Sequence, residues 1–175
     1  MENNPSLRKW ADLQGLAVVA IDTGKKIGTL DDFYFDSSAS PTMSQVPAFH
    51  VKTGLLSARA LSIAAINTIG ADAVTTANEQ ALREEKDDAI LPTLALGRNL
   101  LSYKVMSTSG TLVGTIGNVL LDTTTPSSAL HIAVFELSRS LREHLGGHHT
   151  TFRADQIAHY GQDVLVIPDE VANSL

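Results

Sequence analysis

The 175-residue chain contains no cysteine. Disulfide bonds, a thiolate nucleophile, a zinc ribbon and an iron–sulfur cluster are therefore excluded. Positive charge is also scarce, because 13 Lys and Arg stand against 19 Asp and Glu and leave a net charge of -6. A net negative charge repels phosphate backbones and anionic lipid. We therefore expect no direct nucleic-acid contact and no membrane insertion.

Long apolar runs are missing as well. The longest, 16–21 and the interrupted run 90–101, fall short of the roughly 18 apolar residues that cross a bilayer. The basic pair Arg8 and Lys9 is not followed by the apolar stretch of a signal peptide, so we expect a cytoplasmic protein. Hydrophobic residues still make up 43% of the chain, which is enough apolar material for a packed core.

Two stretches of the chain match each other at an offset of 86 residues. Residues 24–36 align with 110–122, and two glycines, one threonine and the final aspartate are identical. Phe49 and Phe135 match at the same offset. A third block, 66–74, aligns with 157–165 once a five-residue insertion is placed in the second copy, at 146–150. Three blocks in the same order indicate an internal duplication.

The duplication divides the chain into three parts. A first copy spans 1–76 with an N-terminal extension, a charged linker spans 77–99, and a second copy spans 100–175. Capping-box spacing from Thr76 to Glu79 allows a short helix in the linker. Copies of this size have small cores, so we expect the two halves to pack against each other.

Short apolar runs alternate with turn residues in both copies. The expected strands are 17–21, 27–36, 49–52, 60–64 and 73–76 in the first copy, and 105–106, 112–122, 131–137, 150–153 and 163–167 in the second. Such spacing is typical of a small barrel or half-barrel. Helix is expected only as short pieces within 6–13, in the linker and within 138–145. We predict an all-β fold in which two tandem small β-barrels pack as a pseudo-dimer.

Four pairs of matched residues are expected to shape turns and bends. In order they are Gly24 and Gly110, Gly28 and Gly114, Asp36 and Asp122, and Gly70 and Gly161. The first pair supplies a positive φ in a tight turn. The second pair lies inside strand patterns and predicts a bulge or a sharp bend, as small barrels need at their corners. The aspartates are expected to close their strands.

This arrangement resembles tandem PRC-barrel domains. The shared pattern is a turn glycine, a second glycine four residues on, an aspartate eight residues later, and an Ile-x-x-x-Gly-x-Asp close, over about 13–76 and 100–167. Similar domains form the cytoplasmic part of the photosynthetic reaction-centre H subunit and the C-terminal domain of the ribosome maturation factor RimM. The resemblance implies a compact β-barrel that serves as an assembly or docking platform. The chain lacks the membrane helix of the first relative and the N-terminal domain of the second.

The densest group of possible metal ligands is His144, His148 and His149. Histidines four residues apart share a helix face, which suits zinc or nickel. Gly146 and Gly147 would break that helix, and the first copy has no counterpart, so a polar loop is favoured and neither a metal nor a cofactor is assigned. The other histidines stand alone: His50, His131 and His159.

Three carboxylates invite a paired-acid interpretation: Asp31, Asp32 and Asp36. On a regular strand, Asp32 and Asp36 share a face about 13 Å apart, and Asp31 points the other way. We therefore expect no shared site.

The aromatic run 33–35 follows directly. Phe33 and Phe35 are expected to face the core, and Tyr34 to face outward or into the contact between copies. The Ser- and Pro-containing loop 37–47 is expected to be exposed and mobile.

Catalytic signatures are absent from the sequence: there is no nucleophile elbow, Walker loop, dinucleotide fingerprint or zincin helix. We expect a non-enzymatic binding or scaffold protein that offers strand edges or a groove to a protein partner or to a second copy as a homodimer. Ribosome assembly through a ribosomal protein contact is an alternative. A different class of function, metal or small-molecule binding at the histidine loop or between the copies, also stays open.

Overall fold

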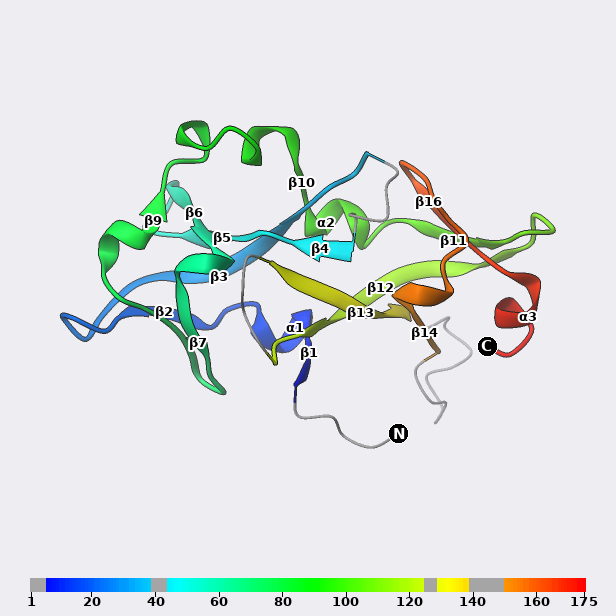
Figure 1. Cartoon of the computed structure of the whole chain (residues 1–175), viewed down its shortest axis with the longest axis horizontal. Helices are drawn as coiled ribbons and strands as arrows, with labels where there is room; N and C mark the ends of the chain where they lie inside the picture. Colours follow the sequence, from blue (N-terminus) through cyan, green and yellow to red (C-terminus); the bar gives the residue numbers. More distant parts are fainter. Residues whose placement is uncertain (1–5, 39–43, 125–128, 139–149) are drawn as a thin grey trace.

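Two eight-stranded mixed sheets lie at opposite ends of an elongated body (Figure 1). The computed structural model describes residues 6–38, 44–124, 129–138 and 150–175. Most neighbouring strands run antiparallel, and each sheet contains one parallel pair. The predicted all-β fold of barrel type is confirmed. No helix in the described part of the chain has the length and apolar character needed to cross a bilayer.

The first sheet has the strand order β7-β8-β2-β3-β5-β6-β9, with β10 added beside β3. Its strands are β2 (Ala17–Ala20), β3 (Lys25–Phe35), β5 (Ala48–Lys52), β6 (Ala58–Ser62), β7 (Ile66–Ile69), β8 (Ala73–Thr76), β9 (Leu82–Arg83) and β10 (Ala95–Leu96). The long strand β3 lies between β2 and β5. Its C-terminal end reaches the middle of the molecule (Figure 1).

The second sheet repeats this pattern in the order β14-β13-β12-β11-β16-β15, with β1 beside β12 and β4 beside β13. Its strands are β1 (Leu7–Lys9), β4 (Gln45–Val46), β11 (Lys104–Ser107), β12 (Leu112–Asp122), β13 (Leu130–Leu137), β14 (Thr151–Arg153), β15 (His159–Tyr160) and β16 (Val164–Ile167). Three short helices complete the fold: α1 (Trp10–Leu13), α2 (Gly97–Leu100) and α3 (Asp169–Ala172).

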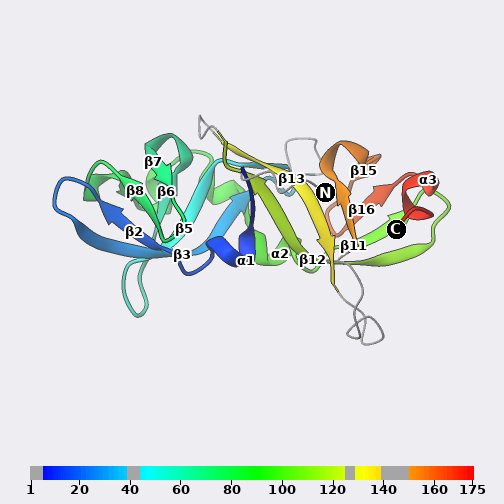
Figure 2. The same ribbon diagram turned by 90° about the horizontal axis from the view of Figure 1, so that it is seen from below.

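The short strand that leads into each half pairs with a strand of the other half. Strand β1, from the N-terminal end, pairs antiparallel with β12 and sets Lys9 opposite Leu120. Strand β10, which precedes the second half, pairs with β3 and sets Leu96 opposite Tyr34. Tyr34 and Leu120 are aligned at the offset of 86, so the two crossings have the same register. The chain thus exchanges equivalent segments between its halves, at the centre of the molecule (Figure 2).

One continuous core follows from this exchange. Buried residues of both halves form a single apolar cluster. Trp10 of α1 meets Phe33 edge-on, with ring centroids 5.0 Å apart, and Phe35 meets Tyr103 of the second half at 6.2 Å. The expectation that two small halves pack against each other agrees with this core, because a small unit alone buries only a modest fraction of its surface.

The matched glycines and aspartates occupy equivalent places in the two sheets. Gly24 and Gly110 have positive φ in the hairpin turns. The pairing register shifts beside Gly28 and beside Gly114, which is the geometry of a β-bulge. Two further pairs close tight turns through backbone or side-chain bonds: the Gly70 and Gly161 N–H groups donate to Ala73 and Val164, and Asp36 and Asp122 accept from the N–H groups two residues on.

The charged part of the linker contains three 3-10 turns, at 79–81, 85–87 and 91–93, and an α-helix begins only at the end of the linker, with α2. The capping box does not form, because Thr76 belongs to β8 and its hydroxyl donates to the Ala65 carbonyl. The segment instead lies along the first sheet, where apolar residues of the linker cover the outer face of β3, β5 and β6. The covered cluster is Tyr34, Ala48, Ala60 and Leu91, with Leu94 and Leu96 beside it.

The short helix expected within 6–13 is present as the four residues of α1, and 7–9 are extended in β1. One further expectation needs correction. The loop 37–47 is not wholly exposed: β4 pairs with β13, and Val46 is fully buried. The helix expected within 138–145 lies almost entirely outside the described residues.

Candidate functional site

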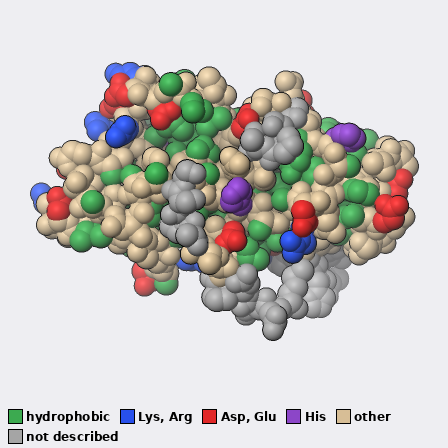
Figure 3. All heavy atoms as spheres, in the orientation of Figure 1, with side chains coloured by type: hydrophobic (Ala, Val, Ile, Leu, Met, Phe, Trp, Pro, Cys, Tyr) green, Lys and Arg blue, Asp and Glu red, His purple; other side chains and the backbone are tan. Residues whose placement is uncertain are grey.

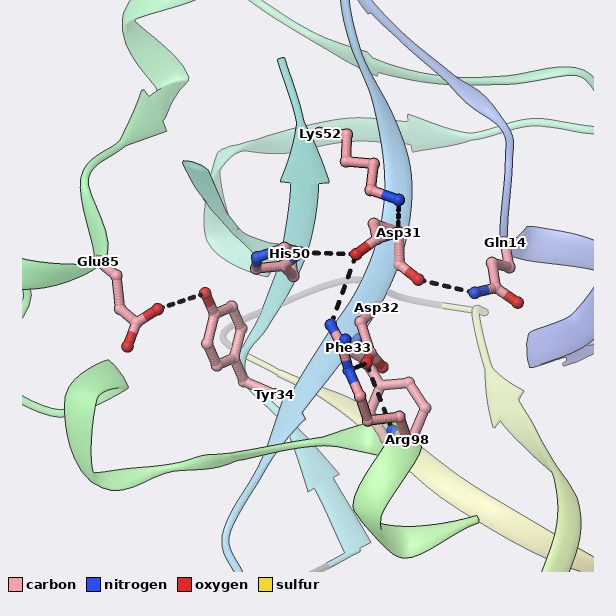
Figure 4. Close-up of polar contacts among 9 residues, drawn as sticks. All are labelled: Gln14, Asp31, Asp32, Phe33, Tyr34, His50, Lys52, Glu85 and Arg98. Carbon is pink, nitrogen blue, oxygen red and sulfur yellow. Dashed lines mark hydrogen bonds and ion pairs between the residues drawn. The ribbon is translucent and has the colours of Figure 1, made fainter. Parts of the chain in front are cut away.

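A hollow of about 410 Å³ opens beside the β5–β6 hairpin of the first half. Its polar lining comes from several elements, drawn in Figure 4: Gln14, Asp31, Asp32, His50, Lys52 and Arg98. The hairpin connection, residues 54–58, forms its remaining wall. Arg98 of α2, at the end of the linker that leads into the second half, completes the site.

A β-bulge brings two neighbouring carboxylates to one guanidinium. The register of β3 against β5 shifts between Leu30 and Asp32, which leaves Asp31 as the additional residue. Arg98 Nε lies 2.8 Å from Asp32 Oδ2, and Arg98 Nη2 lies 3.6 Å from Asp31 Oδ2. The prediction that Asp31 points away from a shared site was wrong, because strict alternation fails at a bulge. Asp36 stays apart, in the turn that follows β3.

Each of these carboxylates is held by further partners. Asp31 accepts from Lys52 Nζ at 2.8 Å and meets His50 Nδ1 at 3.1 Å. Burial raises the pKa of Asp31, but the Lys52 hydrogen bond and the charges of Lys52, His50 and Arg98 outweigh burial, so this pKa lies below its ordinary value. Asp32 accepts the Phe33 N–H at 2.8 Å. The cluster is thus a fixed charge network, and the lowered pKa makes Asp31 poorly suited to exchange protons near neutral pH.

Tyr34 lies under the linker on the same strand, so its side chain is buried and does not face solvent. Its hydroxyl donates to Glu85 Oε2 at 3.1 Å. Burial, with the charge and hydrogen bond of Glu85, raises the pKa of Tyr34 far above its ordinary value. The linker therefore covers one face of the aromatic run while Phe33 and Phe35 enter the core on the other, as expected for those two residues.

The tip of the β5–β6 hairpin carries the most exposed large apolar side chains in the described residues. Leu55 is 98% exposed and Leu56 is 99% exposed. The turn itself is ordered by the Thr53 and Gly54 N–H groups, which both donate to the Ser57 carbonyl. Sequence analysis missed this tip. The signal was available, since two adjacent leucines in an expected turn have no role in a core.

A larger groove of about 920 Å³ lies in the second half, between the β11–β12 hairpin and α3. Hydroxyl side chains and backbone form much of its lining, and Leu112, which is 59% exposed, lies at its rim. Pairing of β12 with β13 begins at Ile116, and the Ser138 N–H donates to the Thr115 carbonyl, so 112–114 keep one edge without a ladder partner in the described chain. Asp169 of α3 accepts the Ser109 N–H at 3.0 Å and closes one end.

The predicted histidine candidates fall in different places. The loop histidines His144, His148 and His149 lie outside the described residues, so zinc or nickel binding there stays a prediction. Of the isolated histidines, His50 joins the charged cluster, while His131 and His159 lie on β13 and β15. In the described ranges, which include this cluster, no three His, Asp or Glu side chains gather in a way that could hold a metal ion.

One face of the molecule shows how the surface charges are distributed. In Figure 3, acidic and basic side chains are interspersed at the left end, acidic side chains lie at the right end, and hydrophobic side chains are spread between them. No large field of one sign covers the described part of this face. Partner recognition is thus more readily built from local features than from the net charge of the chain.

Comparison with known proteins gives one family match. The model of the PRC-barrel domain matches residues 6–41, which include β1, α1 and the β2–β3 hairpin. No curated protein matches the chain. The matched segment contains the turn glycine Gly24 and the bulge glycine Gly28, so the first half of the chain contains a segment similar to the PRC-barrel domain.

Proposed function

We propose that this chain is a non-catalytic binding protein, in which two copies of a PRC-barrel-type unit form one rigid platform for protein assembly. The observation that carries this proposal is the exchange of β1 and β10 at equivalent register. Segments exchanged in this way are expected when two copies of one unit become fused. The family match at 6–41 supports the assignment for the first copy, and PRC-barrel domains in general take part in protein interactions.

The rigidity of the platform supports binding over catalysis. Strands that cross between the halves oppose hinge motion of one half against the other, because movement would break ladder hydrogen bonds and open a shared core. The best-formed polar cluster has its carboxylates neutralised by Lys52 and Arg98. A preformed surface with little internal motion suits a docking partner at low entropic cost.

The second-half groove is the place where we expect a protein segment to bind. An extended segment would add to the free edge of β12 through backbone hydrogen bonds, and alternate side chains would contact Leu112 and the groove floor. Either a different protein or a second copy of this chain could supply that segment.

Site-specific photo-crosslinking in cells of the source organism tests the proposal. A photoreactive residue in place of Leu112 is expected to trap a discrete partner, whereas the same residue in place of Ile90, which is 64% exposed on the linker, is not. A cross-link to the chain itself would identify self-association, and cross-links to ribosomal proteins would identify ribosome assembly. Identical cross-linking at both positions, or none at 112, contradicts the proposed groove.

A further inference from the structure

The Leu55–Leu56 tip has no structural purpose within the chain itself. Both side chains are almost completely exposed, yet the turn that carries them is held by three hydrogen bonds, from Thr53 and Gly54 to Ser57. Folding gains nothing from apolar groups in water, and their presence at a protruding tip indicates a contact outside the chain. Figure 2 shows the β5–β6 connection projecting from the lower side of the first-half sheet.

Cationic side chains surround this tip. Two adjoining hollows share Lys52 and Gly54; one adds Arg98 and the two leucines, and the other adds Lys26. Lys52 and Arg98 are 61% and 60% exposed, whereas the carboxylates that pair with them, Asp31 and Asp32, are only 18% and 5% exposed. The positive groups therefore face solvent, and the negative groups lie beneath them.

From this arrangement we propose that the Leu55–Leu56 tip docks the protein onto an anionic lipid bilayer. Two leucines at a convex apex can enter the interfacial region of a bilayer, which deforms around them, and the flanking cations would then lie at the level of anionic headgroups. A protein partner would need a pocket shaped to receive a convex tip. The deformable, negatively charged surface matches both the shape and the charge without such a pocket.

The net charge of -6 does not oppose this contact strongly. Fixed charges farther than about 8–10 Å from the bilayer are screened at physiological salt, so the groups beside the tip decide the interaction. The expectation of repulsion from anionic lipid holds for the chain as a whole, and the proposed contact concerns one projecting hairpin. No segment crosses the bilayer in this arrangement.

A single fluorophore measures the contact directly. Because the chain has no cysteine, Leu56→Cys creates a unique site for an environment-sensitive dye. With vesicles of phosphatidylcholine containing about 30% phosphatidylglycerol, emission should shift to shorter wavelength, and it should stay unchanged with phosphatidylcholine alone. Ile90→Cys, at an exposed apolar position on the linker, is the matched control and should show no shift.

Co-sedimentation of the unlabelled full chain with the same vesicles completes the test. The double variant Leu55→Ser, Leu56→Ser should lose about tenfold or more in vesicle affinity, and Lys26→Gln about fivefold with a weaker salt dependence. Ile90→Ser should bind like the wild type. Absence of wild-type binding, or equal binding by the double variant, overturns the proposal. If the dye at position 56 responds to an added protein but not to vesicles, the proposal is likewise overturned, and the tip is then a contact for a protein partner.

Discussion

The grooves beside the two long hairpins have the same backbone frame and opposite surface chemistry. In the first half the groove is lined by Lys26 and Lys52, and in the second half the aligned positions are Leu112 and Ser138. The bulge glycines Gly28 and Gly114 lie at equivalent places in both. Backbone geometry is therefore retained where it shapes the sheet, and outward-facing side chains differ where they meet other molecules.

The largest expected effect concerns the shared core. Phe49→Ala and Phe135→Ala remove aligned, fully buried rings, and each should lower the free energy of unfolding by about 3–5 kcal/mol. Because the core is continuous, both variants should unfold in one transition. Urea unfolding followed in parallel by far-UV circular dichroism and by the fluorescence of Trp10, the single tryptophan, tests this.

Two separate unfolding transitions in Phe135→Ala would show that the two halves unfold independently. Trp10 lies against Phe33 and Phe49 in the first half. Its fluorescence would then stay native while circular dichroism reported loss of the second sheet. Leu112→Ser, an exposed substitution, serves as a control and should change stability by less than about 0.5 kcal/mol.

The bulge glycines should differ in their tolerance of a methyl group. A Cβ at position 28 would lie 2.4 Å from Val51 Cγ1 and 2.8 Å from the Lys52 carbonyl oxygen, which belongs to the backbone. At position 114 the nearest atom would be Leu137 Cδ1 at 3.1 Å, the end of a flexible side chain. Gly28→Ala should destabilise by about 1–3 kcal/mol and Gly114→Ala by less than about 1 kcal/mol. Equal losses in thermal unfolding would show that the two bulges are packed alike.

The segment that leads into each half also contributes one cation to the other half. Arg98 pairs with Asp32 across the junction, and Lys9 pairs with Glu136 at 2.8 Å. Arg98→Met should cost about 1–2 kcal/mol, because it uncovers a carboxylate that is almost wholly buried, and Lys9→Met about 1 kcal/mol. Adding Asp32→Asn to Arg98→Met should restore part of the loss, and failure to do so in chemical denaturation would assign the effect to packing of the arginine stem.

The smallest expected effect is a pH dependence that arises from Asp31 in the first half. The pKa of Asp31 is lowered because Lys52, His50 and Arg98 together outweigh its burial. A carboxyl of this kind stabilises the fold above its unfolded pKa, about 3.9, and loses that contribution as the pH falls through its lower folded value.

Lys52→Met should therefore be less stable than the wild type near neutral pH, and the difference should shrink below about pH 4. Urea midpoints measured across this range decide the point. The aligned residue of the second half is Ser138, so Ser138→Met should show no such convergence. A difference that stayed constant with pH would mean that Lys52 acts through packing.

Local patterns in the sequence were sufficient to predict the paired hairpins. The turns at Gly24 and Gly110 depend on a positive φ that few other residues adopt, and Gly28 leaves room for the close approach of Val51 and Lys52, so these features are visible in the residue types themselves. The long strands β3 and β12 were predicted for a similar reason, because an extended apolar run needs no knowledge of its partners to be recognised.

The crossing strands and the charged cluster were decided only by the tertiary structure. Strands β1, β4 and β10 contain two or three residues, too few to show any periodicity, and they pair with partners far away in the sequence. Asp31 and Asp32 meet Arg98 because one inserted residue changes the strand register, and register depends on the opposing strand. By itself the sequence determined which segments are extended and where they turn; contacts between distant segments determined which half each strand joins and which charges meet.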